Sequence, residues 1–319
     1  MNKNLYPPSH LSKINAWEAH KQGIFGEGIG IAVLDTGIYP HPDFHTIKPL
    51  FPKPSHYNPR SFDSLTFNEL LPDSCIAAFS DFLNHKTTPY DDANHGTHIC
   101  GIIASGKKDN QGRYFGIAPK SHLICAKVLD SKGNGKTYTA LAAFEWICRI
   151  RHHYNIRIIN ISMGMPVTRP EDEFTPFMEA INELWNSGFV IVAAAGNNGP
   201  YEKSITAPGI GRNLITVGSC EDNFSGQGPT INCIKKPDLC APGRNVYSCS
   251  NQGSGYILKS GTSMSTPMVS AAAALLLSKE PYLSNKEVKK RLLASARNLG
   301  LPWQQQGAGM LDIKRLLHL

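Results

Sequence analysis

Short apolar runs alternate with stretches of helical periodicity along most of the chain. Unbroken runs rich in β-branched residues predict buried strands, and apolar positions three or four residues apart predict helices. The predicted strands cover residues 29–34, 123–129, 156–161, 189–195 and 214–217, and the predicted helices cover 96–104, 138–150, 174–185 and 262–277. Strands that alternate with helices favour a parallel sheet with both faces covered. The expected fold class is α/β, a three-layer α/β/α sandwich with a mostly parallel central sheet.

Two of the predicted helices carry distinct packing signals. The helix at 262–277 is rich in Ala, which suits close packing in the centre of a domain. The helix at 174–185 has one apolar face. The residues expected on that face are Phe174, Phe177, Met178, Ile181 and Trp185.

No repeat or flexible linker divides the 319 residues, so a single domain over 1–319 is expected. Residues 46–74 carry five prolines, too many for a regular element, and predict a surface insertion. We hypothesise that this insertion shapes the cleft or contacts a partner. Residues 1–10 are interpreted as an N-terminal extension, and the hypothesis for 4–10 is that they lie across the cleft.

Composition and charge exclude several classes of protein. Hydrophobic residues make up 41% and charged residues 18%, as in globular proteins. The net charge of +7 is scattered, and nucleic-acid binding would need clustered basic residues. The longest apolar run, 271–277, is far shorter than the roughly 18 residues that cross a bilayer. The expected partner is therefore neither a nucleic acid nor a membrane.

The eight cysteines are sparse, and none forms a C-x-x-C pair that would suit zinc or redox chemistry. Free thiols in a reducing compartment are expected. Residues 1–8 contain no apolar signal segment. The predicted location is the cytoplasm.

Three short segments combine an acid, a base and a nucleophile. Asp35 ends a predicted strand, His95 precedes a predicted helix, and Ser263 lies at the start of another. Taken singly, each has an ordinary explanation as a turn, packing or capping residue. His95 and His98 also suggest metal ligands, although the zinc-protease helix motif places its histidines four apart around a Glu.

Together the segments resemble the subtilisin-like serine proteases, or subtilases. Asp35, His95 and Ser263 follow in that family's order, and the motifs at 33–37, 95–98, 194–197 and 261–267 match it. The resemblance extends over 11–311. The segments 35–43, 86–95 and 224–242 are most similar to a cytosolic group from spore-forming bacteria. The early position of Asp35, which leaves no room for a signal and prodomain, also favours this intracellular branch.

The resemblance implies a role for each residue. Ser263 is the nucleophile, His95 the general base and then acid, and Asp35 holds the imidazole in the right tautomer. The Asn197 amide and the Ser263 backbone N–H are the expected oxyanion donors. No cofactor is required for this chemistry.

The same resemblance implies where a peptide substrate lies. It would add as a strand between two edge segments, whose residues are Gly133, Asn134, Gly135, Ser162, Met163 and Gly164. The pocket for the residue before the cut would be lined by Ala194, Ala195, Gly196 and Thr206, with Asn198 at its rim. None of these is charged, so no strict demand for a charged residue is expected. Pro208 matches a family proline in a cis turn, with an ordinary trans loop proline as the alternative.

Structural calcium is an open expectation. Many relatives bind it through a carboxylate that matches Asp43 and through a loop that matches 106–116. This loop offers Asp109 and Asn110 to a cation. It also carries Lys107, Lys108 and Arg113, which oppose cation binding.

The predicted function is that of a serine endopeptidase with broad specificity for unfolded proteins or peptides. One alternative is a dedicated protease that removes a leader from one peptide. Others are an inactive subtilase-fold binding protein and a metal hydrolase that uses His95 and His98. The sequence leaves the oligomeric state and the physiological substrate open.

Overall fold

The computed structural model describes residues 8–45, 74–220 and 223–319. Of the predicted insertion at 46–74, only Ser74 lies among the described residues. Of the extension at 1–10, only 8–10 are described, and they lead into the first helix with Pro8 and His10 buried.

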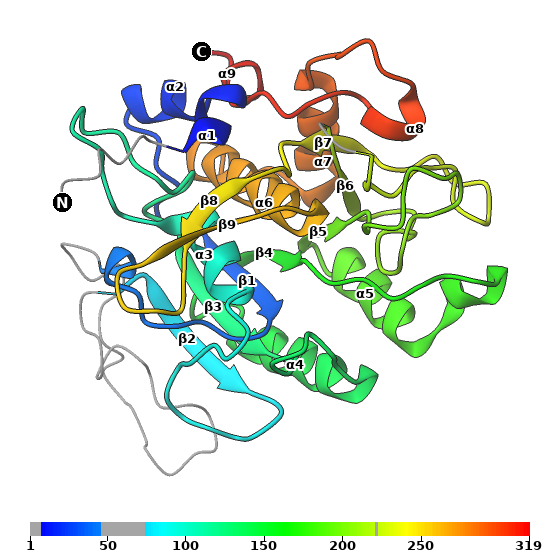
Figure 1. The fold of residues 1–319 in the computed structure, drawn as a ribbon, viewed down its shortest axis with the longest axis horizontal. Helices are drawn as coiled ribbons and strands as arrows, with labels where there is room; N and C mark the ends of the chain where they lie inside the picture. Colours follow the sequence, from blue (N-terminus) through cyan, green and yellow to red (C-terminus); the bar gives the residue numbers. More distant parts are fainter. Residues whose placement is uncertain (1–7, 46–73, 221–222) are drawn as a thin grey trace.

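A seven-stranded sheet forms the centre of the molecule (Figure 1). Its strands are β1 Gly30–Asp35, β2 Ile76–Asp81, β3 His122–Lys127, β4 Ile156–Ile161, β5 Val190–Ala194, β6 Ile215–Ser219 and β7 Leu239–Ala241. Their order is β2-β3-β1-β4-β5-β6-β7, and every pairing is parallel. The strands are buried almost throughout, as unbroken apolar runs require when both faces are covered.

Helices cover the two faces of this sheet. On one face, α3 (Gly96–Ala104) packs against α6 (Thr262–Lys279), and on the other α4 (Thr137–Ile150) packs against α5 (Pro176–Asn186) (Figure 1). The small side chains of α6 let it lie close to the sheet, and its residues Met264 to Leu277 are all buried. The expected three-layer sandwich with a mostly parallel sheet is confirmed.

The remaining elements complete the edges of the sandwich. They are the helices α1 Ser9–Lys13, α2 Ala16–Lys21, α7 Asn285–Ser295, α8 Trp303–Gln306 and α9 Ile313–Leu316, and the short 3-10 helices η1 Pro42–Phe44 and η3 Pro170–Phe174. Strands β8 (Val246–Cys249) and β9 (Tyr256–Lys259) form an antiparallel hairpin beside α3. Helices α1, α2 and α9 lie together, so both ends of the described chain meet (Figure 1).

The helix predicted at 174–185 begins later than expected. Pro176 occupies the first helical position, and the Thr175 side chain accepts the N–H of Met178 as the N-cap. The prediction that Phe174 lies on the buried face was therefore wrong. Phe174 belongs to η3 and is 69% exposed.

The direction in which successive strands are added to the sheet reverses at β1. The chain goes from β1 to β2 at one edge, returns through β3, and then crosses to β4 on the other side of β1. Ligand sites in open parallel sheets form beyond the carboxyl ends of the strands at such a point. Asp35 is the last residue of β1, and Ser162 follows β4 directly.

The hydrogen bond between β4 and α6 provides a test of the packing. Asn160 is fully buried, and its Oδ1 accepts the hydroxyl of Ser270 at 2.8 Å. We expect Ser270→Ala to lower the free energy of unfolding by about 1–3 kcal/mol, because the buried amide oxygen loses its donor. Ser278→Ala is the matched control, since the hydroxyl of Ser278 bonds only its own helix at Leu275.

Chemical denaturation of both variants, in a Ser263→Ala background to prevent self-digestion, measures the difference. The control is expected to change by no more than about 0.5 kcal/mol. Equal stability of the two variants would contradict the assigned role of this bond.

Candidate active site

Asp35 and His95 meet at the carboxyl end of β1. Asp35 ends that strand, and His95 caps the N-terminus of α3. The Oδ1 atom of Asp35 lies 2.7 Å from Nδ1 of His95 and also accepts the backbone N–H of Thr36 at 2.8 Å. The Asp35 side chain is 1% exposed, whereas that of His95 is 26% exposed. This contact places the proton on Nδ1 and leaves Nε2 free to accept another.

A second carboxylate, that of Asp91, joins β1 to α3. Its Oδ1 accepts the hydroxyl of Thr36 at 2.8 Å, and its Oδ2 accepts both the N–H and the hydroxyl of Thr97, at 2.8 and 2.7 Å. The Thr36 hydroxyl in turn accepts the N–H of Gly96 at 2.9 Å. Thr36 adjoins Asp35 in the sequence, and Gly96 and Thr97 directly follow His95. By binding Thr36 and Thr97, Asp91 sets the position of Asp35 relative to His95. The sequence analysis missed Asp91, although an acid just before a predicted helix is a capping signal.

A buried lysine holds three further segments of the site together. Lys127 lies beside Asp35 in the β1–β3 register and is fully buried. Its Nζ donates to the backbone oxygens of Thr36 and Leu129 at 2.6 and 3.0 Å, and to Oδ1 of Asp92 at 2.7 Å. These acceptors belong to the strand end that carries Asp35, the loop that carries His95 and the segment leading to Gly133. Lys127 was also missed, because only the sheet register reveals its location.

The charges around His95 raise its pKa. Burial of the ring lowers the pKa, but the Asp35 carboxylate and its hydrogen bond to Nδ1 raise it by more, and Asp91 adds to the rise. Lys259 acts in the opposite direction. The net result is a pKa above the usual value for histidine, so the imidazolium is favoured more than in water. A base of this kind is available once the pH exceeds the raised pKa.

Ser263 lies in the first turn of α6, partly exposed. Its hydroxyl donates to the backbone oxygen of Ser162 at 2.9 Å, and in the described chain no hydrogen bond joins it to His95. The structure therefore brings Asp35 and His95 into direct contact and leaves Ser263 turned toward β4. Backbone N–H groups in the first turn of a helix have no intrahelical acceptor. The N–H of Ser263 can therefore donate a hydrogen bond to a substrate oxygen.

Asn197 follows β5 and lies beside the start of α6. Its Oδ1 accepts the N–H and the hydroxyl of Thr262 at 2.9 and 3.1 Å. These two bonds fix the amide orientation, so that Nδ2 is the group left to donate. Asn197 is exposed, and both its amide nitrogen and the backbone nitrogen of Ser263 lie near Gly261. The arrangement suits the stabilisation of an oxyanion.

Beside Ser263 lies a cavity of about 210 Å³ without a charged side chain in its lining. Thr206 fills the space that Gly164 and Gly196 leave open, since a Cβ at either glycine would come within 2.4 or 2.5 Å of Thr206 Oγ1. The lining residues are Met163, Gly164, Pro166, Ala194, Gly196, Asn197, Asn198, Thr206, Thr262 and Ser263. Ala195 is fully buried, and neither it nor Ser162 lines this cavity.

A neighbouring cavity of about 220 Å³ lies between the two predicted edge segments. Gly133, Asn134 and Gly135 line one side of it, and Met163 and Gly164 line the other. Its floor is apolar, formed by the side chains of Leu129, Ala140 and Phe177 among others. Pro208 also lines it, and the Ala207–Pro208 bond is cis. An extended peptide between these segments would thus pass over both cavities.

His98 takes no part in this arrangement. Its ring is fully buried, and Nε2 lies 3.0 and 3.2 Å from the backbone oxygens of Val246 and Ile257. Burial lowers the pKa of His98 to about 3, so the ring stays neutral. The two imidazoles therefore face different surroundings, and the geometry does not favour a metal shared by His95 and His98.

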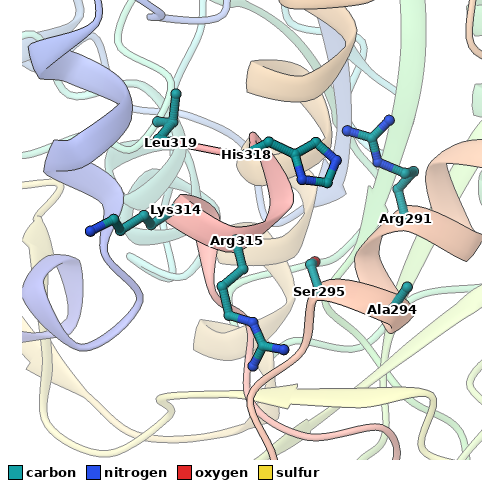
Figure 2. Close-up of a pocket in the computed structure, with 7 residues that line it drawn as sticks. All are labelled: Arg291, Ala294, Ser295, Lys314, Arg315, His318 and Leu319. Carbon is teal, nitrogen blue, oxygen red and sulfur yellow. The ribbon is translucent and has the colours of Figure 1, made fainter.

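A larger cavity, of about 390 Å³, lies far along the chain from these residues. It is lined by Arg291, Ala294, Ser295, Lys314, Arg315, His318 and Leu319 (Figure 2). Its basic side chains do not converge, because Lys314 and Arg315 extend away from Arg291 (Figure 2). Arg291 is moreover paired with Glu280 at 3.1 Å. No predicted site residue lines this cavity.

Among parallel α/β/α proteins, the class whose acid, base and nucleophile follow in the order Asp, His, Ser is that of the subtilisin-like serine proteases. The model of the subtilase family matches residues 26–310. The chain belongs to this family.

Named relatives agree with this assignment. Serine protease AprX of Bacillus subtilis (strain 168) is 35% identical over 85% of this chain. The chain covers 62% of AprX, less than two thirds of its length. Subtilisin Savinase of Lederbergia lenta is 32% identical, with 92% of each chain covered. The expected enzyme class, a serine endopeptidase, is confirmed.

A solved structure also matches the fold. It is described as the crystal structure of a cold adapted subtilisin-like serine proteinase, and it superposes with a TM-score of 0.67. The match covers 91% of this chain and 90% of that one, at 24% sequence identity. The similarity extends across all three layers of the sandwich.

The Asp91 network generates a prediction about rate and pH. We expect Asp91→Asn to lower kcat by up to about 10²-fold, because the contacts that position His95 against Asp35 are lost. Removal of the negative charge also lowers the pKa of His95. Since activity requires neutral His95, the acid limb of the pH–rate profile, which lies above the usual histidine value of about 6.5, should move to lower pH.

Steady-state kinetics on a peptide substrate between pH 5 and 9 check both effects. Asp172→Asn is the matched control, since this carboxylate lies in η3 and accepts the backbone N–H groups of Thr168 and Arg169. An unchanged acid limb in Asp91→Asn would show that Asp91 does not act on His95.

Proposed function

We propose that this protein hydrolyses peptide bonds of unfolded proteins and peptides through an acyl-enzyme on Ser263. The observation that carries the proposal is the 2.7 Å contact between Asp35 and His95 at the N-terminus of α3. Helix α3 packs against α6, whose first turn carries Ser263 beside an uncharged cavity. Asp35, His95 and Ser263 act as a catalytic triad in this proposal.

The proposed reaction begins when the Ser263 hydroxyl turns from Ser162 toward His95. Oγ attacks the scissile carbonyl carbon while Nε2 of His95 takes the hydroxyl proton. The carbonyl oxygen becomes an oxyanion, which accepts hydrogen bonds from the Ser263 N–H and from Asn197. The C–N bond then breaks, His95 returns its proton to the leaving amine, and the acyl group stays on Ser263. A water molecule, deprotonated by His95, releases it and restores the enzyme.

Broad specificity follows from the cavity that would hold the side chain before the cut. Its lining has no charge to demand an opposite charge, and its two buried hydroxyls, those of Thr206 and Thr262, already donate to acceptors within the protein. Affinity would instead come from main-chain hydrogen bonds to the exposed edge at 133–135 and the partly exposed edge at 163–164. Such binding needs an extended segment, which folded proteins offer rarely.

The cytoplasm is the proposed location, and the state of the cysteines supports this proposal. All eight are free thiols. Cys100 and Cys125 lie with their sulfur atoms 3.8 Å apart, without a disulfide. Unlinked thiols at this separation are typical of a reducing compartment. No helix in the described ranges has both the length and the apolar character needed to cross a membrane.

Digestion of unfolded casein tests the function. We expect cuts at many sites by the wild type and none by Ser263→Ala, with the cleaved bonds identified by mass spectrometry. Ser265→Ala is the matched control, since Ser265 lies two residues away but is buried and donates to the oxygens of Ala241 and Pro242. A single cut site would instead favour a dedicated processing protease. No cuts and no labelling by a fluorophosphonate probe would favour a binding protein.

The oxyanion role of Asn197 yields a separate prediction. Asn197→Ala should lower kcat by about 10²- to 10³-fold with little change in KM, the size of loss known for an oxyanion donor in subtilisin itself. Asn198→Ala is the control, because Asn198 lines the same cavity yet makes no bond to Thr262. Kinetics on one peptide substrate suffice, and equal kcat values for the two variants would contradict the role of Asn197.

A further inference from the structure

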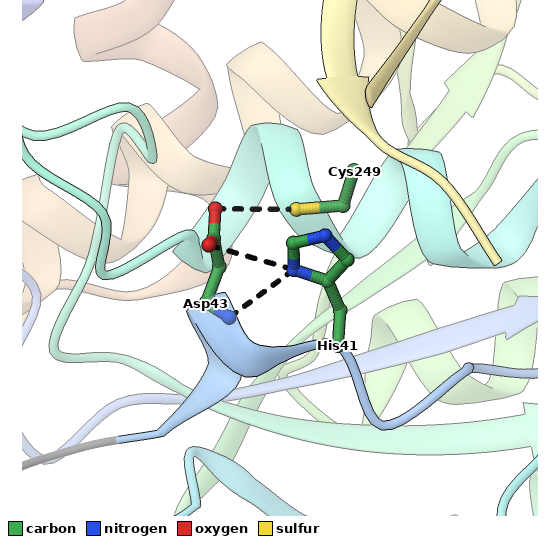
Figure 3. A group of neighbouring side chains, drawn as sticks. All are labelled: His41, Asp43 and Cys249. Atoms are coloured by element: carbon green, nitrogen blue, oxygen red, sulfur yellow. Dashed lines mark hydrogen bonds and ion pairs between the residues drawn. The ribbon is translucent and has the colours of Figure 1, made fainter. Parts of the chain in front are cut away.

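Behind α3, three side chains with different metal-binding atoms converge. His41 and Asp43 lie at η1, after β1, and Cys249 ends β8 (Figure 3). Their ligand atoms all lie within 4.8 Å of one another. We propose that His41, Asp43 and Cys249 bind a zinc ion.

The spacing of these atoms agrees with tetrahedral zinc. The Sγ atom of Cys249 lies 3.6 Å from Oδ2 of Asp43, and Nδ1 of His41 lies 3.5 Å from Oδ1 of Asp43 (Figure 3). Zinc bonds of about 2.0–2.1 Å to nitrogen and oxygen and about 2.3 Å to sulfur put two tetrahedral ligands about 3.3–3.6 Å apart. These two distances end on different oxygens of Asp43, and all the ligand atoms lie within 4.8 Å of one another, so the three side chains would draw together around the ion.

The histidine is already in the state that a metal requires. Nε2 of His41 lies 3.0 Å from the backbone oxygen of Gly255, so this nitrogen carries the proton. The lone pair is then on Nδ1, where it accepts the N–H of Asp43 at 3.1 Å. Metal-bound histidines usually donate their second ring nitrogen to such an oxygen. Zinc would replace this hydrogen bond from the Asp43 N–H.

Further donors surround the carboxylate of Asp43. The Tyr256 hydroxyl lies 2.7 and 2.9 Å from its two oxygens, and the Ser105 hydroxyl donates to Oδ2 at 2.6 Å. These groups orient the carboxylate in the way that a second shell does around a bound metal. A water molecule would supply the fourth ligand. His41 and Cys249 are buried, while the partly exposed Asp43 provides the path of entry.

The donor set fits zinc and does not fit the calcium that the family resemblance implied. Calcium takes six to eight oxygen ligands. At Asp43 the neighbours are an imidazole nitrogen and a thiol, both of which zinc prefers. In the loop at 106–116, Asp109 already binds Arg113 at 2.8 Å, and Lys107 and Lys108 lie over aromatic rings.

The role of this ion would be structural. It would tie the segment after β1 to the β8–β9 hairpin, which leads directly into α6. The segment with His41 and Asp43 follows β1, which carries Asp35. The hairpin with Cys249 precedes α6, which carries Ser263. A ligand that binds only the folded state stabilises it, so zinc should raise the melting temperature.

Cobalt substitution tests the proposal. The probe is Co²⁺ added to the full chain with Ser263→Ala, Cys148→Ser and Cys233→Ser, which remove self-digestion and the two exposed thiols. We expect one equivalent to bind, with a strong thiolate-to-cobalt absorption band and tetrahedral visible bands that Zn²⁺ displaces. Adding Cys249→Ser should abolish the thiolate band and weaken Zn²⁺ binding by at least about tenfold.

Cys240→Ser is the matched control, because Cys240 is equally buried but lies on β7. It should retain the band. The proposal is overturned if Co²⁺ gives no thiolate band in the parent protein, if the band survives Cys249→Ser, or if Ca²⁺ but not Zn²⁺ raises the melting temperature. The parent spectrum and the melting shift decide the matter even if Cys249→Ser does not fold. Activity plays no part, so the outcome is independent of the proposed peptidase function.

Discussion

The site around Asp35 and His95 depends on a buried carboxylate, that of Asp91, which is not a member of the proposed triad. An ionised group without partners is costly to bury, and Asp91 meets this constraint by accepting hydrogen bonds from Thr36, Ala93, Asn94 and Thr97. The donors come from the end of β1, the loop before His95 and the first turn of α3. Satisfying Asp91 therefore fixes the distance between the strand that carries Asp35 and the helix that follows His95. The positive end of the α3 dipole further favours the negative charge.

The pattern of apolar positions predicted five of the seven strands and the helices α3, α4, α5 and α6, because parallel strands buried on both faces form continuous apolar runs. It could not predict β7, which has three residues, or β2, whose start follows a proline-rich stretch. The exposed Phe174 shows a related limit. The helical spacing of apolar residues includes Phe174, but the Thr175 cap and Pro176 make the helix begin after that residue. Local capping chemistry therefore determines where the helix begins, not the apolar periodicity.

Site residues that lie in short sequence motifs could be predicted. Residues that come together only through the pairing register of the strands could not. Asp35, His95, Asn197 and Ser263 each stand in a motif. Lys127 lies beside Asp35 only because β1 and β3 pair in parallel at that register. Likewise, the bond from Ser263 to the Ser162 oxygen follows from the position of α6 against β4. The orientation of the Ser263 side chain is a property of packing, which no local pattern contains.

The two motifs around Asp35 and His95 have a common physical basis. Thr36 and Thr97 supply the hydroxyls that bind Asp91, and the glycines beside them allow close approach of the two elements. A Cβ on Gly96 would lie 2.0 Å from the backbone oxygen of Gly37, and Gly37 itself has a φ of +116°, which side chains rarely adopt. A larger residue at either position would push α3 away from β1. The 2.7 Å contact of Asp35 with His95 would then lengthen, so the threonines and glycines of both motifs maintain this distance.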